Sequence, residues 1–339
     1  MGDTRLLVAS LREPATVVRL DGAGWNDLIR LARAESLLGQ LAARVGDRAP
    51  PRVRMVFNDH AVAVAASHRS ARWEANRALA ALRPLAIPVV LLKGAAYVAA
   101  GLRAAEGRTI GDLDILVTRD RIDEADAALK DAGWESLKDD PYDDAYYRLW
   151  MHELPPLAHA GRGTVIDVHH TILPLTARLR PDAGALIDGA IELSPGLFRL
   201  SPEDIVIHSA LHALHDGDLE GGLRNLWDIH CLLTEFGERP GFWPDLTART
   251  ALHGAAGPVT RAVRLSQRLF GTKSGEGWTG GRSAGDDLFV KRLLARDRWG
   301  RPTRPALRFG FYVRSHWLRM PPLMLARHLW TKWRMRRAG

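Results

Sequence analysis

The sequence predicts an α+β fold in which a small mixed sheet is flanked by N-terminal helices and followed by a C-terminal helical domain. Helical periodicity dominates the first 84 residues. Short β-type runs separated by glycine and proline occupy the middle of the chain, and helical patterns return after Ser201. We therefore expect an N-terminal helical segment (1–84), a sheet domain (85–200) and a C-terminal helical domain (201–339).

Composition is that of an ordinary globular protein. The chain has 339 residues, of which 46% are hydrophobic and 25% charged. The single cysteine, Cys231, excludes a disulfide framework and a cysteine-based zinc site. Met1 to Ser10 carries Asp3 and Arg5 with no sustained apolar run after it, so we expect no signal peptide. No run of about 18 apolar residues predicts a transmembrane segment. A cytoplasmic location is expected.

Two helical stretches are predicted before the sheet. Residues 16–45 carry apolar side chains at three- and four-residue spacing, among them Trp25, Leu28 and Leu31. After Pro50-Pro51, an alanine-rich helical pattern runs over 53–82 and is ended by Pro84 and Pro88. We expect these helices to support the sheet.

The most informative stretch runs from Ile87 to Val117. It predicts a buried strand over 89–92, a Lys93-Gly94 turn that opens a small-residue helix, and a second strand over 112–117. Side chains alternate along a strand, so Asp112 and Asp114 point to one face about 7 Å apart.

Two carboxylates on one face are costly unless a positive charge lies between them. Mg²⁺ takes oxygen ligands and is usually held by one or two carboxylates together with substrate phosphates. The stretch therefore predicts a phosphate-binding turn that faces a metal-binding strand.

A third acid lies further along the sheet domain. A helix over 121–132, closed by Gly133, leads to a strand over 134–137. A hairpin follows, with arms over 151–160 and 163–170. Alternation in the second arm puts Asp167 and His169 on one face. If this arm pairs beside the strand of Asp112 and Asp114, Asp167 joins the same metal site.

Two segments of this domain are expected to be irregular. The acidic, aromatic stretch over 138–147 is predicted to be a loop, either a solvated one or a lid that faces substrate. Residues 171–200 are predicted to be a connector punctuated by proline and glycine.

The C-terminal domain begins with a strong helix signal. Ser201-Pro202-Glu203-Asp204 supplies an N-cap, a first-turn proline and two first-turn acids. His208, His212 and His215 follow on one stripe, either as metal ligands or as packing and substrate-contact residues. In the next helix, over 223–236, Arg224 and Asp228 form either an i, i+4 ion pair or a substrate contact.

The end of the chain is basic. Net charge is +8, and tryptophans alternate with arginines over 311–337, beyond a helical stretch over 245–269 and a loose loop over 271–285. Such a helix either binds nucleic acid or an anionic membrane, or docks its tryptophans on the body of the protein.

The order of apolar strand, Lys-Gly turn, small helix, arginine, Asp-x-Asp strand and the later strand VIDVHH resembles the nucleotidyltransferases of the DNA polymerase β superfamily, in particular the bacterial branch called the uncharacterised nucleotidyltransferase family. The likeness covers roughly residues 75–235. It implies the polymerase-β-type fold, with Asp112, Asp114 and Asp167 as catalytic and metal-binding residues.

That resemblance implies two Mg²⁺ (or Mn²⁺) ions and an NTP, with ATP expected. The reaction would transfer a nucleoside monophosphate to a hydroxyl of a small molecule, peptide, protein or RNA end and release pyrophosphate. We expect Lys93, Gly94, Ala95, Arg108 and His169 to contact nucleotide or its phosphates, or to assist Asp167.

One position departs from the superfamily pattern. Gly-Ser usually follows the first strand, whereas this chain has Gly94-Ala95. Lys93 is expected to supply the missing phosphate contact. The departure also leaves a second hypothesis open, a non-catalytic nucleotide-binding or partner-binding protein of antitoxin-like or regulatory type on the same fold.

Overall fold

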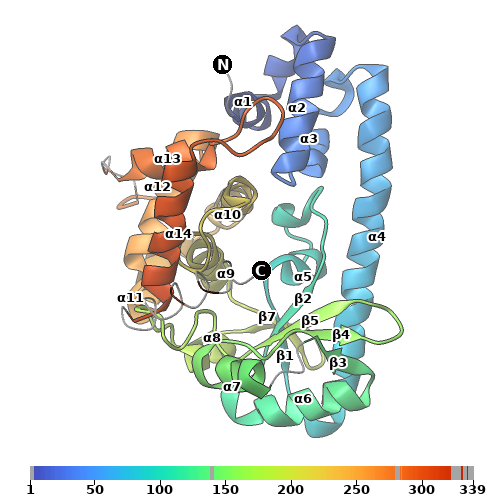
Figure 1. The fold of residues 1–339 in the computed structure, drawn as a ribbon, viewed down its shortest axis with the longest axis vertical. Helices are drawn as coiled ribbons and strands as arrows, with labels where there is room; N and C mark the ends of the chain where they lie inside the picture. Colours follow the sequence, from blue (N-terminus) through green and yellow to red (C-terminus); the bar gives the residue numbers. More distant parts are fainter. Residues whose placement is uncertain are drawn as a thin grey trace.

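The computed structural model of the chain describes residues 4–137, 141–278, 283, 285–321, 330 and 334. Its helices and strands form the predicted α+β fold, with one mixed sheet, helices before it and helices after it (Figure 1). The long helix α4 (Pro51–Leu82) runs down one side of the molecule, beside α2 (Gly22–Ala34) and α3 (Leu38–Val45) at its start and beside the sheet at its end. The helices α9 (Pro202–Leu211) and α10 (Gly222–Phe236) lie between the sheet and the last helices. Buried apolar side chains from all three parts join one core.

The helical stretch predicted over 16–45 is divided in the structure. It comprises α2 (Gly22–Ala34) and α3 (Leu38–Val45), because Ser36 between them takes a left-handed φ of 55° that no helix accommodates. A helix before them, α1 (Arg5–Arg12), was not predicted. The helix predicted over 53–82 is α4, which starts at Pro51, a residue that suits the first helical position.

The sheet has seven strands in the order β3-β4-β5-β2-β1-β7-β6. At its centre, β2 pairs antiparallel with β1 and parallel with β5, which places Asp114 directly beside Asp167. The strands, in chain order, are β1 (Val89–Leu91), β2 (Leu113–Leu116), β3 (Trp134–Ser136), β4 (Leu157–His159), β5 (Val165–His169), β6 (Ile191–Ser194) and β7 (Leu197–Arg199).

Two helices connect the first strands as expected. The short helix α5 (Lys93–Ala99) follows β1 directly and is buried over most of its length. After β2, α6 (Ile122–Asp131) ends before Gly133, whose φ of 96° is the left-handed value predicted for the residue that closes this helix.

Both segments predicted to be irregular contain regular structure. The connector over 171–200 holds α8 (Ala183–Asp188) and the hairpin of β6 and β7, and β7 extends the sheet by pairing parallel with β1. Its strands were missed because they are only four and three residues long and Pro195-Gly196 lies between them, a pattern also typical of a loop. In the predicted loop over 138–147, residues from Pro141 belong to α7 (Pro141–Trp150), and 138–140 lie outside the described residues.

The C-terminal helices begin at the predicted cap. Ser201 Oγ accepts a hydrogen bond of 3.1 Å from the Asp204 amide at the start of α9. The stretch predicted as one helix over 245–269 is two, because Gly254 interrupts it at a φ of 62°. The helices after α10 are α11 (Phe242–Leu252), α12 (Ala256–Phe270), α13 (Asp286–Leu293) and α14 (Pro305–Arg319).

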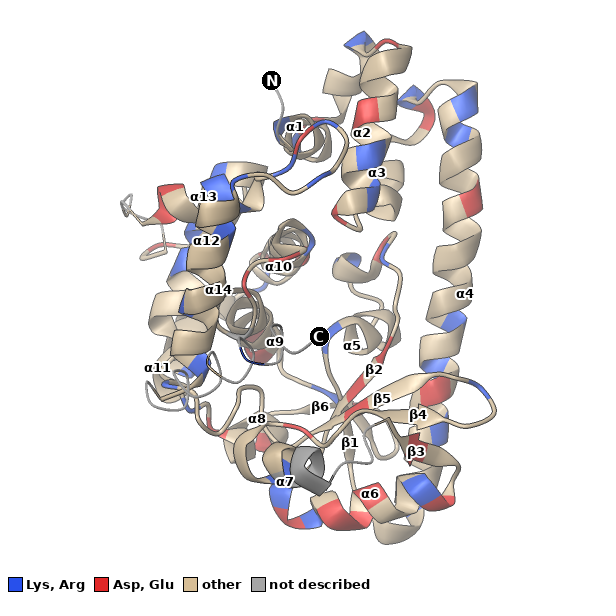
Figure 2. Ribbon diagram, in the orientation of Figure 1, with Lys and Arg blue, Asp and Glu red and all other residues tan. Residues whose placement is uncertain are grey.

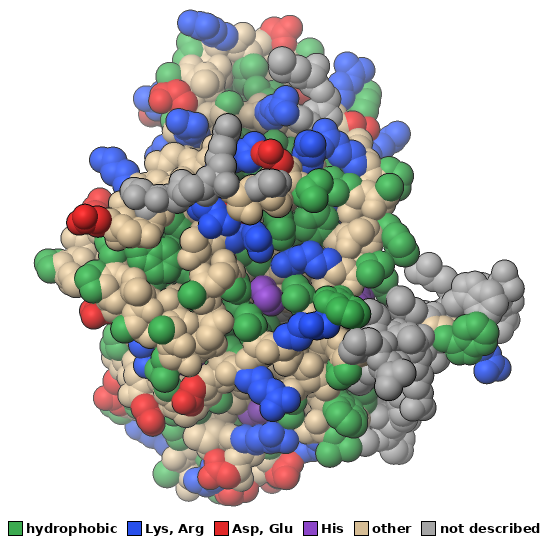
Figure 3. All heavy atoms as spheres, turned by 90° about the vertical axis from the view of Figure 1, so that its left-hand side faces the viewer, with side chains coloured by type: hydrophobic (Ala, Val, Ile, Leu, Met, Phe, Trp, Pro, Cys, Tyr) green, Lys and Arg blue, Asp and Glu red, His purple; other side chains and the backbone are tan. Residues whose placement is uncertain are grey.

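Lys and Arg side chains gather in a band down the face made by the last helices, with hydrophobic groups between them (Figure 3). Within α14, Trp317 docks on the connector after β5, because Arg178 stacks 4.3 Å from its ring and donates to its carbonyl oxygen. Arg314 instead turns inward and donates to the Leu214 carbonyl. Most of the predicted basic tail, from 322 onward, lies outside the described residues. No described helix is long and apolar enough to cross a bilayer.

Candidate active site

The structure brings the three predicted acids together where β2 and β5 lie side by side. Asp112 is exposed just before β2, Asp114 on β2 is 3% exposed, and Asp167 is the register partner of Asp114 on β5. One carboxylate oxygen from each lies within 4.8 Å of those of the other two. In Figure 2, the red acidic positions of β2 and β5 lie next to each other, between the surrounding helices.

The Lys93 ammonium balances the negative charge of one of these acids, Asp114. Its Nζ lies 2.7 Å from Asp114 Oδ1, and its backbone holds a left-handed φ of 46° at the turn after β1. Burial alone lowers the pKa of Lys93, but Asp114, Glu153 and Asp112 outweigh burial and raise it. Burial likewise raises the pKa of Asp114, and Lys93 and His169 reverse that effect and hold it well below its usual range. Asp114 is therefore already paired with a cation, the Lys93 ammonium, in the protein without metal.

Asp167 has no such compensation. Burial, helped by the charges of Asp114 and Glu153, raises the pKa of Asp167 to about 7. The site thus holds more carboxylates than its ammonium can balance. An all-oxygen set of three neighbouring carboxylates fits a hard divalent cation such as Mg²⁺ or Mn²⁺, which would restore the charge balance.

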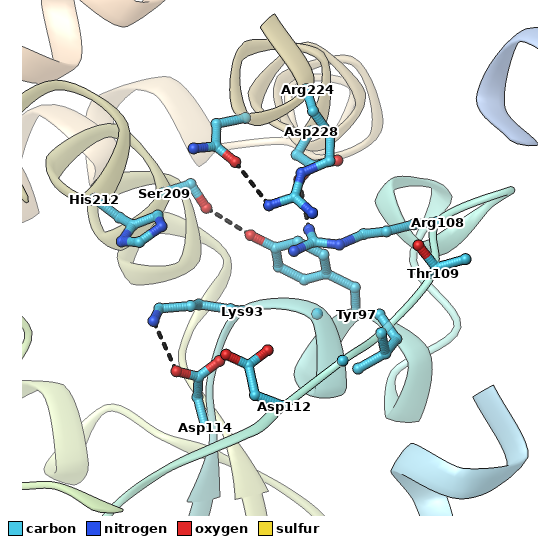
Figure 4. Close-up of a pocket in the computed structure, with 14 residues that line it drawn as sticks. Lys93, Tyr97, Arg108, Thr109, Asp112, Asp114, Ser209, His212, Arg224 and Asp228 are labelled. Atoms are coloured by element: carbon cyan, nitrogen blue, oxygen red, sulfur yellow. Dashed lines mark hydrogen bonds and ion pairs between the residues drawn. The ribbon is translucent and has the colours of Figure 1, made fainter. Parts of the chain in front are cut away.

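A pocket of about 680 Å³ opens in front of Asp112 and Asp114. Figure 4 shows these acids on one side and Arg224 and Asp228 of α10 across from them. Its lining comes from the turn after β1, the loop before β2, and the helices α9 and α10. These residues are Lys93, Gly94, Tyr97, Arg108, Thr109, Ile110, Gly111, Asp112, Asp114, Ser209, His212, Arg224, Asn225 and Asp228.

Arg108, expected to contact phosphate, is engaged in a buried ion pair. Its Nη1 lies 2.5 Å from Asp228 Oδ2, and its guanidinium stacks 5.2 Å from the Tyr97 ring. The Tyr97 hydroxyl in turn lies 2.7 Å from Ser209 Oγ on α9. This chain of polar contacts ties α5 and the loop before β2 to both helices of the far wall.

Asp228 therefore pairs with Arg108, in place of the ion pair predicted between Arg224 and Asp228. Arg224 donates to the side chain of Asn225 at 3.3 Å instead. Burial, together with the like charge of Arg108, lowers the pKa of Arg224. Among the described lining residues, Arg224 is the cation that no carboxylate pairs with, so the pocket carries positive charge opposite its acids.

Gly94 and Ala95 occupy different environments. Gly94 lines the pocket, and a methyl group there would lie 2.7 Å from the Ile110 side chain, so glycine allows α5 to approach the loop before β2. Ala95 is 3% exposed, packs in the core and does not belong to the pocket lining. The departure from Gly-Ser therefore concerns a side chain that faces away from the pocket.

The predicted histidine stripe stays together only in part, because His208 and His212 pack edge to face with ring centroids 6.4 Å apart and His215 turns elsewhere. His212 lines the pocket and begins a π-helical turn, His212–Asp216, a feature often found at functional sites. His208 is buried near Lys93 and His169, and its burial and the charge of Lys93 hold its pKa well below the usual range. The wider turn carries His215 toward Arg314 and Arg261, where burial lowers its pKa to about 4.

A family model described as uncharacterised nucleotidyltransferase matches residues 21–271. The chain belongs to this nucleotidyltransferase family. The resemblance predicted from residues 75–235 is confirmed and extends in both directions. No curated protein and no solved structure matches the chain. The matched range contains the whole sheet and both walls of the pocket.

Sequence reasoning missed a second group of candidate ligands beside the acids of the nucleotidyltransferase. His152 and Glu153 lie in an irregular segment before β4, and an isolated β-bridge sets Glu153 opposite His169. His169 Nε2 lies 3.1 Å from Asp114 Oδ1 and its Nδ1 lies 3.3 Å from Glu153 Oε2. The sequence predicted a hairpin arm over 151–160, but only Leu157–His159 form a strand, and the irregular part that carries His152 and Glu153 was not predicted to belong to the site.

The raised pKa of Asp167 predicts how stability depends on pH without metal. Between about pH 4 and pH 7 the unfolded chain loses this proton while the folded protein keeps it, so Asp167 destabilises the fold progressively as the pH rises. Asp167→Asn should therefore raise the melting temperature relative to wild type by more at pH 8 than at pH 5, measured in EDTA. A difference that does not change with pH would contradict the site's electrostatics.

Proposed function

We propose that this protein transfers a nucleoside monophosphate from an NTP, with ATP the expected nucleotide, to a hydroxyl of an acceptor and releases pyrophosphate. The observation that carries the proposal is the meeting of Asp112, Asp114 and Asp167, the first two of which line a pocket with Arg224 on its far wall. Membership of a nucleotidyltransferase family supports the same reaction class. A pocket acidic at one end and cationic at the other suits a metal-bound triphosphate.

The three acids are the residues that would hold Mg²⁺ or Mn²⁺. When bound, such ions supply charge neutralisation at the phosphates and a lower pKa for the acceptor hydroxyl. Asp112 is exposed and free to turn toward a ligand, whereas Asp114 is fixed by Lys93 and His169. Burial raises the pKa of Asp167 to about 7 in the metal-free protein, and a bound divalent ion would favour the ionised carboxylate, which is suited to accept the proton of the acceptor hydroxyl.

Two cations are proposed to bind the phosphates. Lys93 lies beside Asp114 with a mobile ammonium, which can turn to phosphate when a stronger cation takes its place on the carboxylate. Arg224 stands across the pocket without a carboxylate partner among the described residues. Its planar fork suits phosphate oxygens. Arg108, engaged with Asp228, positions Tyr97 and the α10 wall.

The non-catalytic alternative keeps the same pocket and binds nucleotide or a partner without turnover. Ala95 was the feature in its favour, and the burial of that side chain away from the pocket weakens it. This alternative predicts NTP binding like that of the enzyme, but no release of pyrophosphate from Mg-NTP in the presence of cell extract.

Nucleotide binding tests the pocket assignment. Asp112→Asn removes an exposed metal ligand, so it should abolish Mg²⁺-dependent NTP binding in calorimetry while leaving the fold intact. Asp120→Asn changes an equally exposed acid just beyond β2 and should bind as wild type does. Unchanged Mg-NTP affinity in Asp112→Asn would remove the metal assignment.

Arg224→Gln, in the same titration, should weaken NTP binding by roughly 1.5–3 kcal/mol, the worth of a charge-assisted hydrogen bond, and leave nucleoside binding unchanged. Arg69→Gln, an exposed change on α4, is the control for loss of positive charge. If Arg224→Gln loses nucleoside and NTP affinity equally, Arg224 shapes the pocket and does not contact phosphate.

A further inference from the structure

A second cluster of metal-ligating side chains adjoins the acids. It consists of His152, Glu153 and His169, whose ligand atoms all lie within 4.8 Å of one another. His152 is 6% exposed and His169 is 1% exposed, while Glu153 is half-buried. The rings of the two histidines are inclined by 34° with centroids 5.2 Å apart. Two imidazoles and one carboxylate thus converge on one point at the rim of the sheet.

Two separations within the cluster exceed the usual length of an N–H···O hydrogen bond. Glu153 Oε2 lies 3.3 Å from His169 Nδ1 and 3.6 Å from His152 Nε2. An N–H···O hydrogen bond spans about 2.7–3.2 Å. Ligands bound tetrahedrally at about 2.0–2.2 Å from Zn²⁺ are separated by about 3.3–3.6 Å. The spacing is that of neighbouring ligands around one cation.

His169 is also oriented as a metal ligand. Its Nε2 lies at hydrogen-bonding distance, 3.1 Å, from Asp114 Oδ1. A neutral imidazole that donates from Nε2 carries its lone pair on Nδ1. This buried Nδ1 has no hydrogen-bond partner among the described residues, and it points to the side of Glu153. Metal-binding histidines commonly donate their other ring N–H to a carboxylate in this way.

We propose that His152, Glu153 and His169 bind one Zn²⁺ ion, at a site distinct from the three-acid site for the nucleotide's metal ions. Two nitrogens and one carboxylate form a donor set that Zn²⁺ prefers and Mg²⁺ does not. Three protein ligands leave a further position for water or a substrate oxygen. The inference goes beyond the proposed function, and zinc binding is measured without nucleotide.

Local charge favours a cation here. Carboxylates are in excess among the described groups here: Asp114, Glu153 and Asp112 all raise the pKa of the Lys93 ammonium, and Asp114 and Glu153 raise the pKa of Asp167. A divalent ion between Glu153 and the two histidines would offset part of this excess. Arg108 does not neutralise these carboxylates, because its charge is paired with Asp228.

Asp114 would connect the two metal sites. It belongs to the three-acid site and is also the acceptor for His169. Zinc on His169 Nδ1 would fix the ring and its Nε2 proton, so the orientation of Asp114 would depend on the occupancy of the zinc site. His169, predicted to assist the catalytic acids, would thus act as a positioning residue for Asp114.

Metal content tests the site directly. The full-length protein, stripped with chelator and incubated with Zn²⁺, should retain about one zinc per chain after desalting, as measured by mass spectrometry. Glu153→Gln and His152→Asn should each weaken zinc affinity more than about tenfold. Asp112→Asn, a three-acid variant outside the cluster, should keep its zinc. With Co²⁺ in place of zinc, the wild type should show visible bands that both cluster variants lose.

The overturning results are equally specific. A wild-type chain that binds neither Zn²⁺ nor Co²⁺ contains a histidine held between two carboxylates and no metal site. If both cluster variants retain zinc, or if Asp112→Asn loses zinc to the same extent as they do, the zinc binds at another place on the protein. Circular dichroism confirms folding, and Glu153→Gln, which keeps shape and hydrogen-bonding atoms, decides the case if His152→Asn misfolds. Loss of zinc with Mg-NTP binding intact separates this site from the proposed function.

Discussion

The buried contact of Lys93 with Asp114 is the interaction on which the site depends. A carboxylate that is 3% exposed cannot remain charged there without a partner, and the Lys93 ammonium supplies it at 2.7 Å. Holding that contact requires the left-handed backbone at Lys93 and the close approach of Gly94 to the loop before β2. The turn, the two central strands and the loop therefore form one unit that presents Asp112 and Asp114 to the pocket.

Charge beyond this pair remains unbalanced, and that imbalance is what makes the site suited to metal chemistry. The charges of Asp114 and Glu153 help burial to raise the pKa of Asp167, while Arg224 adds positive charge across the pocket. Such separated charge lowers the stability of the free protein. Binding of the proposed metal-bound triphosphate would neutralise these charges and offset that loss of stability. The helices α9 and α10 contribute here as much as the sheet, because they carry the far wall.

Much of this arrangement was predictable from local patterns. Alternation along β2 and β5 put Asp112, Asp114, Asp167 and His169 on shared faces, and the Lys93-Gly94 turn was evident from its break between strand and helix. What could not be predicted depends on contacts between distant segments. The partner of Asp228 is 120 positions away rather than four, and Glu153 reaches the site from an aperiodic segment through one bridge to His169. A short edge hairpin such as β6 and β7, joined by Pro195-Gly196, has too few residues for its sequence to distinguish it from a loop.

The central claim is that these acids support transfer of the α-phosphoryl group with its nucleoside. The most direct measurement incubates the protein with cell extract, Mg²⁺ and each common NTP labelled in turn with ³²P at the α or the γ position. The account predicts label in an acceptor from α-labelled NTP, none from γ-labelled NTP, and none with Asp114→Asn. Transfer of the γ label, or no transfer from any α-labelled NTP, would contradict it.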